Sequence, residues 1–227
     1  MSISKYYKSM DTDIFDQIPL FESLSKDERD SLASRFVLRH HPKNSVIINE
    51  GDDTSSFYII LKGRVKVYLT DDSGKEVILN IQGEGEYLGE VALLDEGPRS
   101  ASVLTIEDSR FAVLDRLSFI DCISENPAVS LKIMQGLTRQ LRALSENVRS
   151  LALMDVYGRV ARLLLELAVD QGGDKVIEDK LTQNDIAARI GASPKMVGRI
   201  MQDLKKGGYV RKNGKHLVIA KSLPPAW

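Results

Sequence analysis

The chain has 227 residues, of which 43% are hydrophobic and 28% are charged, and its formal net charge is −1. This is an ordinary globular composition, with enough length for one large or two modest domains. Residues 1–16 show no signal peptide, and no window approaches the roughly 18 consecutive apolar residues of a membrane-spanning helix, so we expect a cytoplasmic protein. The single cysteine, Cys122, excludes an internal disulfide, and with three histidines it argues against a metal site.

The first half of the chain changes from a helical to a β pattern. Residues 25–36 carry leucines at helical spacing among many charges, which indicates a surface helix. From about Val37 to Asp115, short β-branched and aromatic runs alternate with turns that contain glycine or aspartate. The runs are 45–48, 57–60, 65–68, 77–80 and 111–114. Many short strands at regular spacing predict an all-β roll or barrel.

The β pattern stops near Leu117, and a helical pattern follows Pro127. Apolar residues then alternate at spacings of three and four: Met134, Leu137, Leu141, Leu144, Val148 and Leu151. One helix packed on its own domain is possible, but the strict heptad favours a partner helix and predicts a homodimer about a two-fold axis. Asp155 is expected to cap a second helix from Val156 to about Val169, and 170–179 is expected to be a loop.

The C-terminal part predicts two short helices joined by a glycine turn. Thr182 and Asp185 resemble a capping box, which opens a helix to about Ile190. Ser193 is an expected N-cap for a second helix, which runs from Pro194 to about Lys206. The inner face of this second helix is expected to hold Val197, Ile200, Met201 and Leu204. This arrangement is a helix-turn-helix.

A β-hairpin and a concentration of positive charge follow. Asn213-Gly214 separates two strand-like runs, 209–212 and 215–219, which predicts a basic wing. Residues 189–221 hold nine basic residues and one acidic residue, a charge of +8, so the rest of the chain carries −9. Any one of these lysines can be a solvated surface charge, but together they favour DNA binding. We expect Arg199 to read a guanine and Lys195 to contact a base or a phosphate.

Residues 89–101 predict a site for a ribose joined to a phosphate. A glycine turn at Gly89 lets backbone N–H groups approach an anion. Arg99 offers a planar fork of donors for the phosphate, Ser100 adds a hydroxyl, and Glu90 can accept a hydrogen bond from a sugar hydroxyl. The alternative is that Arg99 forms a structural ion pair with Glu90 or Asp95.

The chain resembles the cAMP receptor protein/FNR (Crp/Fnr) family of bacterial transcription regulators over nearly its whole length. The matching segments are Glu50-Gly51-Asp52, Leu61–Val65, Leu88–Ala101, Leu151–Val156 with Gly158-Arg159, and Val197-Gly198-Arg199-Ile200 through Gly214-Lys215. The resemblance implies an α+β fold with an N-terminal double-stranded β-roll that binds a cyclic nucleotide, a long dimerisation helix, and a C-terminal winged helix-turn-helix. The expected domain bounds are 1–126, 127–154 and 155–227.

The resemblance also implies functional residues. The candidate ligand-binding residues are Gly89, Glu90, Val91, Arg99, Ser100, Leu144 and Ser145. The candidate DNA-binding residues are Thr182, Gln183, Ser193, Lys195, Met196, Arg199, Lys205 and Lys215. Leu144 stands where the cAMP receptor protein has a base-contacting hydroxyl, and leucine cannot hydrogen-bond the adenine amino group.

These features predict a dimeric DNA-binding regulator switched by cAMP, which binds a pseudo-palindromic operator and contacts RNA polymerase. The effector alternatives are cGMP and a cyclic dinucleotide. Two rival functions are a constitutive regulator, in which residues 89–101 (the cassette) have only a structural role, and a module that signals to a protein partner. No nucleophile–base pair or metal constellation indicates an enzyme.

Overall fold

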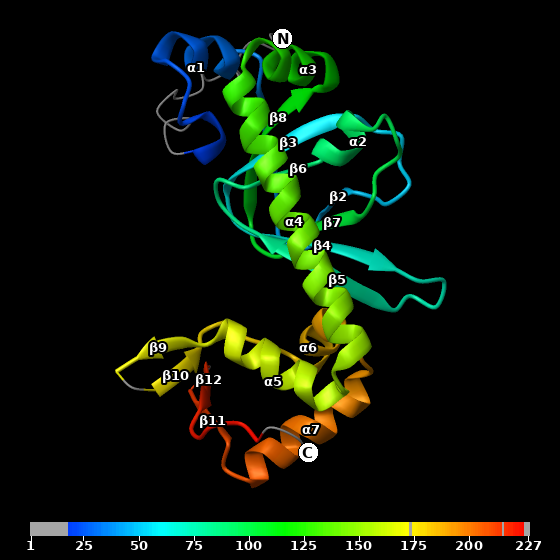
Figure 1. The fold of residues 1–227 in the computed structure, drawn as a ribbon, viewed down its shortest axis with the longest axis vertical. Coiled ribbons are helices and arrows are strands. Elements are labelled where there is room, and N and C mark those ends of the chain that lie inside the picture. Colours follow the sequence, from blue (N-terminus) through cyan, green and yellow to red (C-terminus); the bar gives the residue numbers. More distant parts are fainter. Residues whose placement is uncertain (1–17, 173, 215, 225–227) are drawn as a thin grey trace, which may run out of the picture. The chain divides into compact units, whose positions relative to one another are not determined.

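The computed structural model describes residues 18–172, 174–214 and 216–224 (Figure 1). They form two compact units. One comprises the described residues up to 69 together with 80–141, and the other comprises 70–79 together with the described residues from 142 onwards. Helix α4 (Pro127–Leu153) contributes residues to both units.

Two four-stranded sheets lie within residues 37–115, and all their residues belong to the first unit except those within 70–79. One has the order β1-β8-β3-β6, from β1 (Val37–His41), β8 (Ser109–Asp115), β3 (Ser56–Lys62) and β6 (Tyr87–Leu88). The other has the order β2-β7-β4-β5, from β2 (Val46–Ile48), β7 (Ser102–Thr105), β4 (Val65–Thr70) and β5 (Glu76–Gln82). Four of the five predicted runs lie within a strand, and the fifth, 45–48, lies in β2 except for Ser45. The sequence pattern had not singled out β1, β6 and β7.

Alternation along the strands places a separate core on each face of the first sheet. Phe111 and Ile60 face the second sheet, where they pack with Val65 and Val103. Ala112, the next residue of β8, joins a core on the opposite face. Helices cover that face (Figure 1). They are the 3-10 helix η3 (Pro19–Phe21), α1 (Lys26–Ala33), α3 (Arg116–Glu125) and the start of α4.

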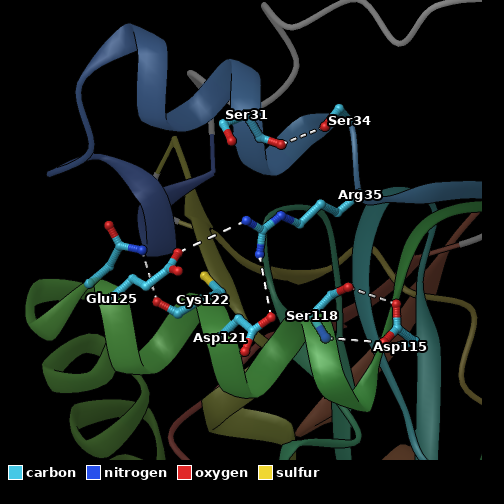
Figure 2. A network of polar contacts seen from close by, with 9 residues as sticks. Ser31, Ser34, Arg35, Asp115, Ser118, Asp121, Cys122 and Glu125 are labelled. Atoms are coloured by element: carbon cyan, nitrogen blue, oxygen red, sulfur yellow. Dashed lines mark hydrogen bonds and ion pairs between the residues drawn. The ribbon is translucent and has the colours of Figure 1, made fainter.

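Ion pairs and caps connect the ends of α1 and α3 (Figure 2). Arg35, just after α1, lies 3.9 Å from a carboxylate oxygen of Asp121 and 4.0 Å from one of Glu125, both on α3. Asp115 caps α3 by accepting a hydrogen bond from the backbone N–H of Ser118. The carboxylates of the two ion pairs are exposed, so these pairs stabilise the contact weakly. Between them Cys122 is buried, which raises the pKa of its thiol to about 11.

The predicted heptad residues lie on α4 as expected, but they do not share one environment. Leu137 packs against the core of the first unit. The others are exposed, with exposed fractions of 55% for Met134, 65% for Leu141, 44% for Leu144, 65% for Val148 and 50% for Leu151. The helix therefore uses one side for its own core and presents a separate apolar stripe.

The second unit is a three-helix core with a small sheet. Helix α5 (Val156–Leu167) begins at Asp155, whose carboxylate accepts from the N–H of Gly158 at 2.7 Å. Helices α6 (Gln183–Ile190) and α7 (Pro194–Lys206) pack with α5. The predicted capping box is present, and Ser193 caps α7 through the N–H of Met196. The predicted inner face of α7 is buried.

The prediction of a loop over 170–179 is wrong. Residues there form β9 (Val169–Gln171) and β10 (Asp174–Ile177), in a sheet of order β11-β12-β10-β9 with β11 (Val210–Asn213) and β12 (His216–Ile219). Val176 pairs with Val218, so the wing hairpin recruits β10, and Ile177 is fully buried. The turn signal at Gly172 is kept, because this residue has a φ of 60° and lies between β9 and β10, while the residues on either side of the turn pair as strands.

Candidate functional site

Gly89 ends β6 and starts the short helix α2 (Glu90–Leu94) in a conformation that favours glycine. Its φ of 90° lies in the left-handed region. A Cβ built on it would lie 2.6 Å from Nη1 of Arg99 and 2.6 Å from the carbonyl oxygen of Ser56. Both backbone conformation and space therefore exclude a side chain, and this is what allows Arg99 to approach the chain here.

Arg99 is 3% exposed, and its guanidinium is held by three oxygens. Nε donates to Oγ1 of Thr54 at 3.1 Å, Nη1 to the carbonyl of Gly89 at 3.1 Å, and Nη2 to the carbonyl of Ser56 at 2.8 Å. An arginine has five N–H donors, so one on each terminal nitrogen remains for another partner.

The charge of Arg99 is not neutralised by an ion pair. All three hydrogen-bond acceptors are uncharged, and within the described part of the chain no carboxylate lies at ion-pairing distance from the guanidinium. The alternative pairing with Glu90 or Asp95 is therefore not what the structure shows. Burial lowers the pKa of Arg99, and interactions with Tyr58, Glu90 and Asp52 partly oppose that shift. An arginine remains charged nonetheless, so this turn holds a buried cation without a counter-ion.

Glu90 lies beside this cation and is also 3% exposed. Its Oε1 accepts a hydrogen bond from Nε2 of Gln140 on α4 at 3.1 Å. Burial raises the pKa of Glu90, and the hydrogen bond from Gln140 and the charge of Arg99 lower it in part. The structure thus brings Gly89, Glu90 and Arg99 together as predicted.

The other candidate ligand residues lie in less enclosed positions. Val91 follows Glu90 in α2 and is half-buried, and Ser100 is exposed next to Arg99. Leu144 and Ser145 lie on the part of α4 that belongs to the second unit, and both are exposed.

A second contact joins β6, the strand just before the cassette, to α4. Oη of Tyr87, on β6, donates to the carbonyl of Ile133 at 3.4 Å. Gly136 lies directly opposite this hydroxyl, because a Cβ built on Gly136 would overlap Oη and would lie 3.0 Å from Cζ. Burial and the charge of Glu90 raise the pKa of Tyr87 to about 12, so its hydroxyl keeps its proton. Tyr87 and Glu90 therefore both contact α4, at Ile133 and at Gln140.

The candidate DNA-binding residues fall on the exposed surface of α6 and α7. Lys195, Met196 and Arg199 lie exposed on the first turns of α7, and Lys205 is exposed near its end. The side chain of Gln183 packs against α7 at Gly198, because a Cβ built on Gly198 would lie 2.7 Å from Oε1 of Gln183.

The two candidate DNA-binding hydroxyls cap helices of the second unit, and one arginine of the wing forms an ion pair. Thr182 caps α6, accepting from the N–H of Asp185 at 3.1 Å, and Ser193 caps α7. Arg211 of the wing forms an ion pair with Asp174 at 2.8 Å. Lys215, also predicted to bind DNA, lies outside the described residues.

Comparison with known proteins accounts for both halves of the chain. Residues 38–126 match the cyclic nucleotide-binding domain, and residues 158–222 match the Crp-like helix-turn-helix domain. Over 185 residues the chain is 34% identical to the CRP-like cAMP-activated global transcriptional regulator of Mycobacterium tuberculosis, covering 80% of this chain and 83% of that protein. The chain belongs to the Crp/Fnr family of transcription regulators.

Solved Crp/Fnr structures share the fold. Catabolite activator protein of Thermus thermophilus is 30% identical and covers 90% of this chain and 94% of its own, with a TM-score of 0.54. The c-di-GMP-responsive global regulator CLP of Xanthomonas campestris is 21% identical, with a TM-score of 0.77 over 87% of this chain and 100% of its own. The predicted fold class is thereby confirmed, and the curated relatives are transcription regulators rather than enzymes.

Sequence reasoning missed two side chains that contact this Crp/Fnr cassette, Thr54 and Gln140. Thr54 lies in the polar segment after Gly51, where a hydroxyl is an ordinary loop residue. Gln140 precedes Leu144 by one helical turn, and that spacing was the only available signal for it.

Among the residues that the structure describes, no three histidine, cysteine, aspartate or glutamate side chains form a group that could hold a metal ion. Across the same residues, no helix is both long and apolar enough to cross a bilayer.

Proposed function

We propose that this protein is a dimeric transcription regulator whose DNA binding is controlled by a cyclic nucleotide, with cAMP as the effector. The observation that carries this proposal is the buried, unneutralised guanidinium of Arg99 within a cyclic nucleotide-binding domain. A buried cation without a counter-ion is costly unless something else neutralises it, and a ligand phosphate would do so.

In this proposal the phosphate binds Arg99 through the two remaining N–H donors. Ser100 and the backbone of Gly89 and Val91 surround it, and Glu90 accepts from a ribose hydroxyl. Leu144 and Ser145 contact the base. Two curated relatives, from Mycobacterium tuberculosis and Salmonella typhimurium, are cAMP-activated by name, and this supports cAMP over the alternatives cGMP and a cyclic dinucleotide.

The exposed apolar stripe of α4 supports the dimer. An apolar stripe at heptad spacing is what a coiled-coil partner covers, and a second copy of the same helix is self-complementary about a two-fold axis. Two helix-turn-helix units related by that axis would bind half-sites about 34 Å apart, so the operator would be pseudo-palindromic.

The exposed face of α7 supports direct base recognition. Arg199 is exposed on this face with Lys195 and Met196 near it, and in this proposal it donates two hydrogen bonds to a guanine. Thr182, Gln183, Ser193, Lys205 and Lys215 contact phosphates in this proposal. RNA polymerase is the partner through which the bound dimer acts.

Ligand binding would act through helix α4. Tyr87, just before residues 89–101, and Glu90, within them, contact α4 near Ile133, Gly136 and Gln140. The same helix runs on to Leu153, two residues before the cap of α5. A ligand that binds one arrangement of α4 more tightly than another would shift the population of the DNA-binding state.

Calorimetric titration with cAMP, cGMP and c-di-GMP tests the effector. We expect saturable micromolar cAMP binding with two sites per dimer, and its loss in Arg99→Gln. Arg110→Gln is a matched control, because Arg110 is an exposed arginine on β8 of the same unit. Tight binding of cGMP or c-di-GMP alone would replace cAMP as the effector. No binding of any of them, with operator binding intact, would favour a constitutive regulator.

A further inference from the structure

The segment that carries Thr54 is fastened to Arg99 along its backbone. The N–H of Gly51 donates to the carbonyl of Arg99 at 2.8 Å, and the N–H of Arg99 donates to the carbonyl of Asp52 at 2.9 Å. Thr54 follows two residues later and accepts from Nε of Arg99 at 3.1 Å. The two backbone hydrogen bonds fix residues 51–52 beside Arg99, and this brings the hydroxyl of Thr54 to the guanidinium.

Thr54 differs from the other two partners of Arg99 in being a side chain. The carbonyls of Gly89 and Ser56 are backbone groups, so these two hydrogen bonds use no side-chain atom of either residue. A threonine hydroxyl can accept and donate at once. Here it accepts from Arg99, no described protein atom accepts its hydrogen, and Thr54 is an exposed residue.

We propose that Thr54 is a ligand-contacting residue beside the cassette, which donates its hydroxyl hydrogen to a phosphate oxygen of the cyclic nucleotide and orients Arg99 toward the same phosphate. This inference rests on the proposed function. It gives the proposed phosphate site a side-chain donor outside residues 89–101, from the loop that precedes β3.

Removal of the Thr54 hydroxyl is expected to weaken phosphate binding in two ways. Thr54→Val keeps the shape of the side chain, leaves the buried Nε of Arg99 without its acceptor, and deletes the second donor. A lost hydrogen bond to a charged group corresponds to roughly 10- to 100-fold in affinity. Thr54→Ser keeps the hydroxyl and is expected to bind within about threefold of wild type.

The test is calorimetry of the full chain with cAMP and with the two phosphorothioate diastereomers of cAMP, in which sulfur replaces one or the other exocyclic oxygen. We expect Thr54→Val to weaken cAMP binding at least tenfold, and to bring the affinity ratio of the two diastereomers toward one. Thr54→Ser should restore both. Ser55→Ala, an exposed neighbour in the same loop, should change neither.

Each other outcome is decisive. Unchanged cAMP affinity in Thr54→Val overturns this inference and leaves the proposed function intact. Weaker binding with an unchanged diastereomer ratio overturns it as well, because a loop that is merely destabilised does not distinguish the two oxygens. A wild-type protein that binds no cyclic nucleotide overturns the proposed function and this inference together. Circular dichroism of Thr54→Val checks that the variant is folded.

Discussion

Gly136→Ala is expected to reverse the usual effect of this substitution in a helix. Replacing glycine by alanine inside a helix normally stabilises it by about 1 kcal/mol. Here the new Cβ would overlap Oη of Tyr87 and lie 3.0 Å from its Cζ, so either the ring or α4 must move. Overpacking of this kind costs about 1–3 kcal/mol, which offsets or exceeds the gain in helix propensity.

Tyr87→Phe removes the atom responsible for the overlap. In that background the nearest ring atom to the new Cβ is Cζ at 3.0 Å, which a shift of a few tenths of an ångström relieves. Gly136→Ala should then stabilise the protein, as it would in an ordinary helix. The coupling between the two substitutions is therefore expected to be about 1–3 kcal/mol.

Urea denaturation of the wild type, both single variants and the double variant measures this coupling. Far-UV circular dichroism follows the helices, and an unchanged slope shows that the same surface is exposed on unfolding. Stabilisation of the wild type by Gly136→Ala of about 1 kcal/mol would refute the predicted steric overlap. A coupling free energy between the two substitutions below about 0.5 kcal/mol would refute it as well.

Three further predictions concern Glu90, the DNA-reading face and the dimer. Because the pKa of Glu90 is raised, the stabilisation that its protonated form gives is present below the ordinary pKa of 4.5 and is lost at higher pH. The urea midpoint of Glu90→Gln should therefore rise relative to that of the wild type above pH 4.5. A pH-independent difference between the two midpoints would contradict this. In fluorescence anisotropy, Arg199→Ala should cost about 1–3 kcal/mol on operators with the contacted guanine only, and Lys205→Ala should weaken all DNA alike; uniform loss in both would refute the assignment. Val148→Glu should yield monomers in sedimentation velocity, and a persisting dimer would place the interface elsewhere.

Local signals in the sequence were sufficient wherever a residue's role depends on its neighbours in the chain. The caps at Asp155, Thr182 and Ser193 depend on residues three positions away, and all three are present. The pairing of Gly89 with Arg99 followed from residue type, because a left-handed glycine and an arginine in one turn suit an anion.

Signals failed where a role depends on strand register or on packing. Thr54 and Gln140 reach the cassette from 45 and 50 residues away in sequence, and no local pattern encodes such a distance. Leu137 continues the heptad, but it packs against the core of its own unit. Heptad spacing alone does not indicate which of its residues the rest of the unit will cover. β10 exists because β12 offers it an edge to pair with.

Burial of Cys122 makes it a built-in reporter of motion in the sensor unit. It is the only cysteine of the chain, and it lies in the core beneath α3 with a pKa of about 11. Since only an exposed thiolate reacts, a thiol reagent can modify this protein only during moments when that core opens. The labelling rate therefore records how often the sensor unit opens, without an introduced probe. A ligand that binds only the closed unit would slow labelling by a factor of one plus the ratio of ligand concentration to Kd.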